Sequence, residues 1–142
     1  MWLFLGEELA SNLWLCSGGY DEDEVRCRFL PEPAETTVWD FDVYVMPAFR
    51  ASFAFPALWD AVNAYLRERG IRWTLSRISA FNLTSASSHE SLGARDVGRA
   101  KFLRLGRLQI GTSTLCPHWH VSLTSRSRPV IRVRAPLNDI GE

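Results

Sequence analysis

The side chains best suited to chemistry are gathered in one short segment, residues 116–124, which reads Cys-Pro-His-Trp-His-Val-Ser-Leu-Thr. Successive side chains of a β-strand point to opposite faces, so an extended segment sorts these residues into two sets. The apolar set, which we expect to face the core, is Trp119, Val121 and Leu123. The polar set, which we expect on the other face, includes His118, His120 and Ser122.

A second alternating run, residues 130–134, follows after a short loop and carries Arg132 and Arg134. If the two runs pair as neighbouring strands, Ser122 lies opposite Arg132 and His120 lies opposite Arg134. Such a face suits phosphoryl chemistry, because an imidazole can act as general acid or base while guanidiniums bind the charge. The favoured interpretation of this face is an exposed, polar, arginine-rich sheet surface available for contacts. The enzyme hypothesis is a phosphoesterase or nucleotide-processing enzyme that uses His118, His120, Ser122, Arg132 and Arg134.

One part of this segment, His120-Val121-Ser122-Leu123, resembles the His-x-Ser/Thr-x pattern of the two-histidine phosphoesterases. The resemblance implies a strand histidine and a hydroxyl two residues later that face the same phosphate. Those enzymes carry two such motifs, one in each half of an internal duplication. The other match here is His89-Glu90-Ser91-Leu92, in a segment predicted as a loop, and the sequence shows no duplication. The chain is therefore not assigned to that family.

Two sets of side chains could hold a metal ion. Two histidines two residues apart, with Cys116 close by, offer ligands for zinc, but the neighbouring arginines oppose a cation and a fourth ligand is not evident. Asp40 and Asp42 could hold Mg²⁺ on one strand face. Salt bridges to Arg26 and Arg28 of a neighbouring alternating run are the favoured interpretation. The sequence therefore predicts no metal and no cofactor.

The charges are distributed unevenly along the chain. Residues 1–62 carry eleven acids and three bases, whereas residues 63–142 carry five acids and thirteen bases, so that the net charge is zero. Such a division indicates either pairing within the protein, which we favour, or a binding surface. The candidate binding residues are the acidic run and the arginines of the last strand: Asp21, Glu22, Asp23, Glu24, Arg132 and Arg134.

The hydrophobic pattern predicts mostly strands around one helix. Residues 25–29 and 37–46 alternate and are expected to pair antiparallel, with their arginines and aspartates on one face. Apolar residues at helical spacing predict a helix over about 56–69, followed by Gly70. Residues 84–98 show no periodicity and are predicted as a loop. Residues 100–110 are predicted as one strand with a bulge at Gly106.

These elements predict an α+β fold: a single domain over residues 1–142, with an antiparallel β-sheet of five or more strands packed by one main helix. The length suffices for a buried core. Its expected members are Trp39, Phe41, Leu58, Val62, Leu66, Trp73, Trp119 and Val121.

The first residues contain neither a basic segment nor an apolar run long enough for a signal peptide or a membrane span, so we expect a cytoplasmic protein that does not bind membranes. Three scattered cysteines, Cys16, Cys27 and Cys116, do not predict disulfides. The favoured function is a small non-enzymatic binding protein that acts through a charged surface on a macromolecular partner, in the first place a protein. Immunity or inhibitor proteins that neutralise bacterial toxins are examples. Nucleic-acid binding through the basic C-terminal half is a further alternative.

Overall fold

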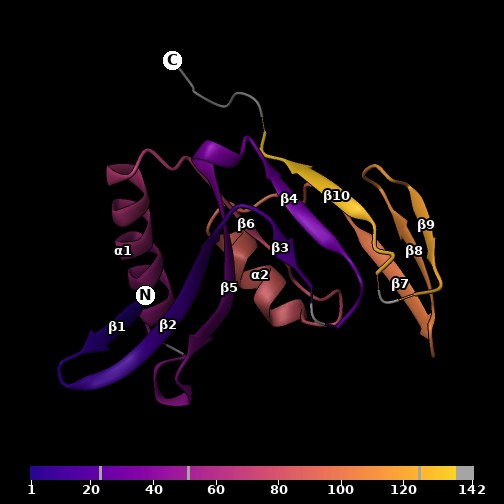
Figure 1. Ribbon diagram of the computed structural model, residues 1–142. Helices are drawn as coiled ribbons and strands as arrows, with labels where there is room; N and C mark the ends of the chain where they lie inside the picture. The colour runs from indigo at the N-terminus through magenta and orange to yellow at the C-terminus, as the bar shows by residue number, and fades with distance from the viewer. Residues whose placement is uncertain (23, 51, 125, 137–142) are drawn as a thin grey trace. The chain divides into compact units, whose positions relative to one another are not determined.

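The computed structural model describes residues 1–22, 24–50, 52–124 and 126–136 (Figure 1). Within these residues the fold is mixed α+β, with two α-helices and ten strands in three sheets. The prediction of one antiparallel sheet with five or more strands is therefore wrong. The chain divides into two compact units, unit 1 (residues 1–17 and 36–94) and unit 2 (residues 18–35 and 95–142). The single domain over residues 1–142 stays a prediction.

Unit 1 contains a four-stranded sheet in the order β1-β2-β5-β6. The strands are β1 (Trp2–Leu5), β2 (Glu8–Ser17), β5 (Thr37–Val45) and β6 (Trp73–Ser76). β1, β2 and β5 are antiparallel, whereas β6 runs parallel to β5. This parallel pair is possible because a helix crosses over between β5 and β6 and returns the chain to the same end of the sheet.

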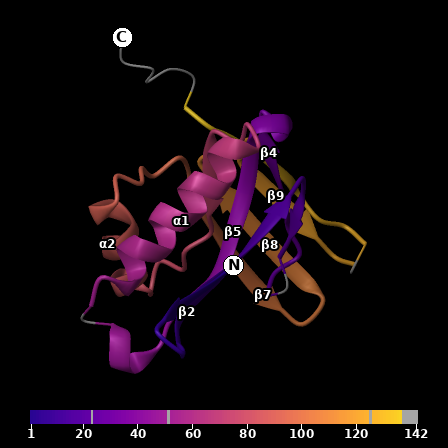
Figure 2. The same cartoon turned by 90° about the vertical axis from the view of Figure 1, so that its left-hand side faces the viewer.

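That helix is α1 (Ala54–Glu68), which confirms the helix predicted over about 56–69 and begins two residues earlier. Its residues Leu58, Val62 and Leu66 follow one another at intervals of four and form a buried stripe. The stripe packs against Leu13 of β2 and Val38 of β5, and Figure 2 shows α1 lying along these strands. The core of unit 1 therefore lies between α1 and one face of the sheet.

A second helix, α2 (Leu83–Ser91), occupies part of the segment that was predicted as a loop over residues 84–98. Asn82 caps it, because its side-chain oxygen accepts a hydrogen bond from the backbone N–H of Ser85 at 3.1 Å. His89 is the one buried residue of this helix. A helix that buries so little apolar surface has no apolar stripe, which is why its sequence shows no helical period.

The predicted pairing of residues 25–29 with residues 37–46 is wrong, because β5 pairs with β2 and β6 instead. A β-bulge interrupts the pairing of β5 with β2, and Asp42 lies in it with φ 51°. Asp40 precedes this bulge. It lies on the same face of the sheet as Val38, because the two residues are two positions apart on β5. The carboxylate of Asp40 is therefore buried in unit 1 and does not meet an arginine of the other run.

Unit 2 contains two three-stranded sheets, in the orders β10-β4-β3 and β7-β8-β9. The first consists of β3 (Tyr20–Asp21), β4 (Arg28–Glu32) and β10 (Val130–Arg134), with β10 parallel to β4. The second is an antiparallel meander of β7 (Ala100–Leu105), β8 (Leu108–Ser113) and β9 (Trp119–Ser122). Two short 3-10 helices complete the elements, η1 (Ala34–Thr36) and η2 (Pro47–Phe49).

The strand predicted over residues 100–110 is a hairpin rather than one bulged strand. The chain turns at Gly106, which has φ +58°, and Leu105 pairs with Leu108 across the turn. A positive φ of this kind is readily adopted by glycine. The shift in the apolar alternation therefore marks a turn between two strands. A turn and a bulge both produce such a shift in the sequence.

The two sheets of unit 2 are joined through Gln109 of β8. Its side-chain oxygen accepts a hydrogen bond from the backbone N–H of Arg26, and its side-chain nitrogen donates one to the carbonyl oxygen of Arg26, both at 2.8 Å. The guanidinium of Arg26 donates to the carbonyl oxygens of Arg107 and Ser122. Arg26 therefore binds the β7–β9 sheet, and its predicted pairing with Asp40 or Asp42 is wrong.

Candidate binding face

The strand β9 alternates as predicted, but its two faces are reversed. Trp119 is 72% exposed and Val121 is 44% exposed, whereas Ser122 is fully buried. The prediction that Trp119 and Val121 belong to the core is therefore wrong. The covered face of the β7–β9 sheet is the one that carries Gln109 and Ser122, because the segment of Arg26 bonds to it there.

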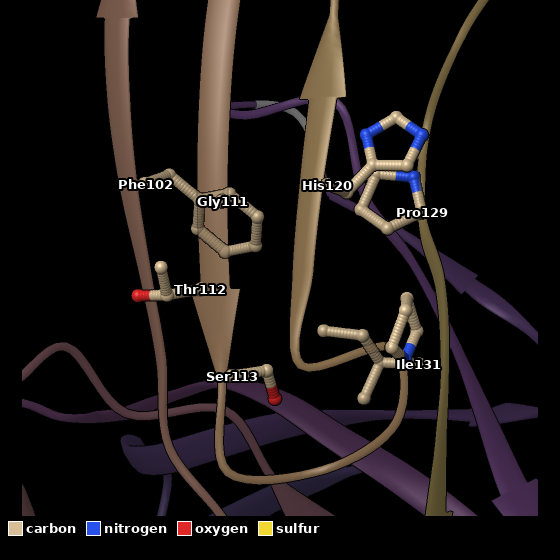
Figure 3. A pocket seen from close by; sticks show the side chains of 8 residues that line it. Phe102, Gly111, Thr112, Ser113, His120, Pro129 and Ile131 are labelled. Atoms are coloured by element: carbon tan, nitrogen blue, oxygen red, sulfur yellow. The ribbon is translucent and has the colours of Figure 1, made fainter.

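Two polar side chains in and beside β9 lie close to backbone carbonyl oxygens. The hydroxyl of Ser122 lies within hydrogen-bond distance of the carbonyl oxygens of Thr124 and Ser127. His118 is exposed, with its Nδ1 3.3 Å from the carbonyl oxygen of Ser113. His120 lines a shallow hollow that encloses no space for a water molecule (Figure 3). Among the described residues that line this hollow, His120 is the one with a titratable side chain.

The arginines of β10 bind a carboxylate of β4, the strand with which β10 pairs. Arg132 Nη1 lies 2.9 Å from Glu32 Oε1, and Arg134 Nε lies 2.9 Å from Glu32 Oε2. The hydrogen bonds from Arg134 and Arg132 lower the pKa of Glu32. The predicted opposition of Ser122 to Arg132 and of His120 to Arg134 is therefore wrong, because β10 pairs in parallel with β4.

The first residue of the acidic run is also paired within unit 2. Asp21 Oδ2 lies 3.2 Å from Arg28 Nη1, and Asp21 Oδ1 lies 2.8 Å from Arg128 Nη1. These three side chains are exposed, and exposed ion pairs contribute only about 0–1 kcal/mol each. The pairs hold Asp21 close to bases of the C-terminal half, which agrees with the expectation of internal pairing.

The other residues of the acidic run differ in exposure. Glu22 is buried, with its carboxylate 3.4 Å from the backbone nitrogen of Glu24, and Glu24 is exposed. Asp23 lies outside the described residues. Unit 2 combines the acidic run with most of the C-terminal bases and holds nine acids against eleven bases. Acids and bases that lie far apart along the sequence are therefore present in nearly equal numbers within unit 2.

The outer face of the β7–β9 sheet is apolar. The pairing places Leu103, Ile110 and Val121 side by side across the three strands, and all three are exposed. Figure 1 shows the three strands next to one another at the yellow-orange end of the chain. We name the whole set the apolar face; its members are Leu103, Leu105, Ile110, Trp119, Val121 and Leu123.

Bases lie on the strands and turns that form the apolar face. Lys101 shares the face of Leu103 on β7, Arg107 lies in the β7–β8 turn, and Arg126 follows β9. The sequence from residue 97 to residue 136 contains eight bases and no acid. Contiguous apolar surface of this kind, with charges at its margin, is typical of interaction sites.

No family model, no curated protein and no solved structure matches this chain. Functional inference therefore depends on the geometry of the molecule alone. Among the residues that the structure describes, no three histidines, cysteines, aspartates or glutamates are grouped so that they could hold a metal ion. Within the same part of the chain, the helices are too short or too polar to cross a membrane.

A buried polar cluster in unit 1 was not predicted. It consists of Asp40 on β5, Ser76 on β6 and His89 on α2. Ser76 Oγ donates to the carboxylate of Asp40, with distances of 2.7 and 2.8 Å to its two oxygens, and His89 Nε2 lies 4.0 Å from Asp40 Oδ1. The ring of His89 packs edge-on against Phe55 and Trp59, with centroids 5.6 and 5.9 Å apart.

The protonation of this cluster follows from its burial. His89 Nδ1 lies 2.8 Å from the carbonyl oxygen of Ser85, so this nitrogen carries a proton. Burial raises the pKa of Asp40, while the hydrogen bond from Ser76 and the charge of His89 act in the opposite direction. Because Asp40 and His89 are almost completely inaccessible, we assign the cluster to the stability of unit 1 rather than to a reaction with a substrate.

We expect Asp40→Asn to change how stability depends on pH. The folded state holds a proton on Asp40 more firmly than the unfolded state does, so wild-type stability declines as pH rises from the ordinary carboxyl range through the raised pKa. Asparagine keeps an acceptor for Ser76 and does not ionise. The free energy of unfolding of the variant should therefore increase relative to that of the wild type as pH rises. Urea unfolding between about pH 4 and pH 8 measures this difference.

The matched control is Asp42→Asn, which removes an exposed carboxylate of the same strand. A constant difference in stability between Asp40→Asn and the wild type over the whole pH range would contradict the expected effect.

Proposed function

We propose that this chain is a non-enzymatic binding protein that binds an acidic protein partner through the apolar face of unit 2. The observation that supports this proposal is the combination of six exposed large apolar side chains on one sheet face with bases on the same strands and turns. An apolar centre supplies affinity by burial, and charges at the margin select and steer the partner.

Trp119 is the expected anchor of this interface. It is the largest and the most exposed side chain of the apolar face. Tryptophan is enriched among the residues that dominate binding energy, because it buries a large rigid surface at little cost in conformational entropy. Leu103, Ile110 and Val121 form the flat centre against which an apolar partner segment would pack.

The enzyme hypothesis has less support. Its five residues are dispersed, because Arg132 and Arg134 bind Glu32, Ser122 bonds to backbone and His120 faces a shallow hollow without a second titratable group. An acid–base site needs two such groups around one recess.

Nucleic-acid binding is the second candidate, and the absence of acids from residues 97–136 favours it. Single-stranded nucleic acids bind to sheets through bases that stack on aromatic side chains. The apolar face offers Trp119 as its one aromatic member, and the rest is aliphatic. Aliphatic side chains pack better against a protein surface, so we favour an acidic protein.

Two narrower proposals are compatible with this function. An inhibitor or immunity protein would use the apolar face to cover a toxin that presents acids around an apolar surface. A cytoplasmic location is compatible with the three cysteines, Cys16, Cys27 and Cys116, which are all free thiols.

We expect Trp119→Ala to weaken binding of the purified partner by about tenfold to a hundredfold, because removing an interface anchor costs about 1–3 kcal/mol. The partner is first captured from the native host with the wild-type protein, identified by mass spectrometry and then purified. Isothermal titration calorimetry gives the affinity of each variant. Lys101→Glu should in addition slow association at low salt, because it places a negative charge at the basic margin.

The matched control is Leu83→Ala, an exposed apolar side chain of α2 in unit 1, which should leave the affinity unchanged. Wild-type affinity in Trp119→Ala would contradict the proposal. Selective capture of RNA or DNA instead of a protein would replace it with the nucleic-acid alternative.

A further inference from the structure

The strand β1 forms an edge of the unit 1 sheet. Within the described residues it pairs with β2 on one side and with no strand on the other. Its sequence, Trp2-Leu3-Phe4-Leu5, contains neither a charge nor a proline. Edge strands usually carry such residues to prevent pairing with other chains, so an apolar edge without them is suited to receive an additional strand.

An exposed aromatic surface adjoins this edge. The pairing of the strands aligns Trp2, Asn12 and Tyr44 across β1, β2 and β5, and Trp14 follows Asn12 on the same face. The rings of Trp2 and Trp14 meet edge to face, with centroids 6.4 Å apart and planes at 72°. The opposite face of this sheet packs against α1 through Leu13. We name the exposed residues Trp2, Phe4, Trp14 and Tyr44 the aromatic face.

The strands of the aromatic face carry acids and no bases. Residues 1–17 contain Glu7 and Glu8 in and beside the β1–β2 turn, and β5 contributes the exposed Asp42. One guanidinium already lies over this face, because Arg50 stands 5.7 Å from the ring centroid of Tyr44. Aromatic faces attract cations, arginine more often than lysine, and neighbouring carboxylates strengthen the attraction.

We propose that the β1 edge binds an extended segment of another protein that carries arginines at alternate positions, as an added strand of the unit 1 sheet. Backbone hydrogen bonds to the free edge of β1 supply sequence-independent affinity. Alternate side chains of the segment then lie beside Trp2 and Phe4, where guanidiniums bind to ring faces, and Glu7 in the β1–β2 turn supplies a carboxylate at the end of the edge strand.

The same geometry determines the remaining residues of the segment. Side chains between the arginines point to the other face of the sheet, the face that Leu3 shares with the core under α1. Small branched apolar residues such as valine suit this side and also favour an extended backbone. The recognised pattern is therefore an alternation of arginine and aliphatic residues, and this binding is independent of the apolar face of unit 2.

The test uses the full chain and a fluorescently labelled peptide of about seven residues that alternates arginine and valine. Fluorescence anisotropy should show saturable binding. A peptide with glutamate in place of arginine should not bind, and neither should a peptide whose alternate backbone nitrogens are methylated, because it cannot form the strand hydrogen bonds. We expect Trp2→Ala to weaken binding about fivefold or more through the lost cation–π contact.

Trp2 is 57% exposed, so its replacement should leave the fold intact, and circular dichroism checks this. Trp119→Ala is the matched control: it should bind the peptide like the wild type, even though it disrupts the proposed binding face of unit 2. Equal binding of the methylated or the glutamate peptide would overturn the inference. So would self-association of the chain that Trp2→Ala abolishes, because a second copy would then occupy the edge.

Discussion

Replacing Leu58 with alanine is expected to lower the free energy of unfolding by about 2–5 kcal/mol. Leu58 is fully buried in the middle of α1. It packs in the cluster that joins the helix to Leu13 of β2 and Val38 of β5. Truncation of its side chain leaves a cavity that these neighbours can fill only in part. The loss of stability therefore includes the free energy of transferring the removed atoms from water to the core and the cost of the remaining cavity.

Urea unfolding followed by tryptophan fluorescence measures this loss. The matched control is Asn63→Ala, an exposed position of the same helix, where we expect a change within about 0.5 kcal/mol. A loss equally small in Leu58→Ala would show that the stripe of α1 does not carry the core of unit 1.

Elements whose apolar residues recur with a clear helical or strand periodicity were predictable from the sequence. The interval of four between Leu58, Val62 and Leu66 predicted α1 to within two residues, because one helix face is buried along its whole length. α2 was missed because it buries His89 and little else. Its sequence signal is limited to the cap at Asn82, and a single capping residue occurs in many loops.

The reversal of β9 has a different cause. The alternation of Trp119, His120, Val121 and Ser122 predicts correctly which side chains share a face. It does not predict which face another sheet covers, because that depends on segments far away in the chain. Here Arg26 binds the face of Ser122, and the larger apolar side chains remain exposed. This uncovered apolar face is the observation on which the proposed binding function rests.

Long-range partners were the least predictable part. Opposite charges in the two halves of the sequence correctly indicated internal pairing, but the predicted pairs were wrong. Arg132 and Arg134 bind Glu32 because β10 runs parallel to β4, a connection over about a hundred residues without a local signal. The cluster of Asp40, Ser76 and His89 likewise combines three separate elements. The candidate enzyme face was inferred from an assumed pairing of residues 116–124 with residues 130–134, and the pairing of β10 with β4 separates the arginines from that face.

The second large effect is expected for Gln109→Leu, which should lower the free energy of unfolding by about 2–6 kcal/mol. Gln109 is almost fully buried, and its side-chain amide bonds to both the backbone N–H and the carbonyl of Arg26 at 2.8 Å. Leucine fills a similar volume but bonds to neither group. Each partly buried backbone group that loses its partner costs about 1–3 kcal/mol, so the two losses together give the expected range.

The matched control is Thr112→Val, an equally conservative change from a polar to an apolar side chain at an exposed position of β8. It should alter stability by no more than about 0.5 kcal/mol. Because Gln109 joins the segment of Arg26 to the β7–β9 sheet, Gln109→Leu should also speed hydrogen exchange at the amide of Arg26, which loses its acceptor. Unchanged stability together with unchanged exchange at that amide would mean that the two sheets of unit 2 are held together by apolar contacts, such as those around Ile131 and Phe102, which line the same hollow, and not by this amide.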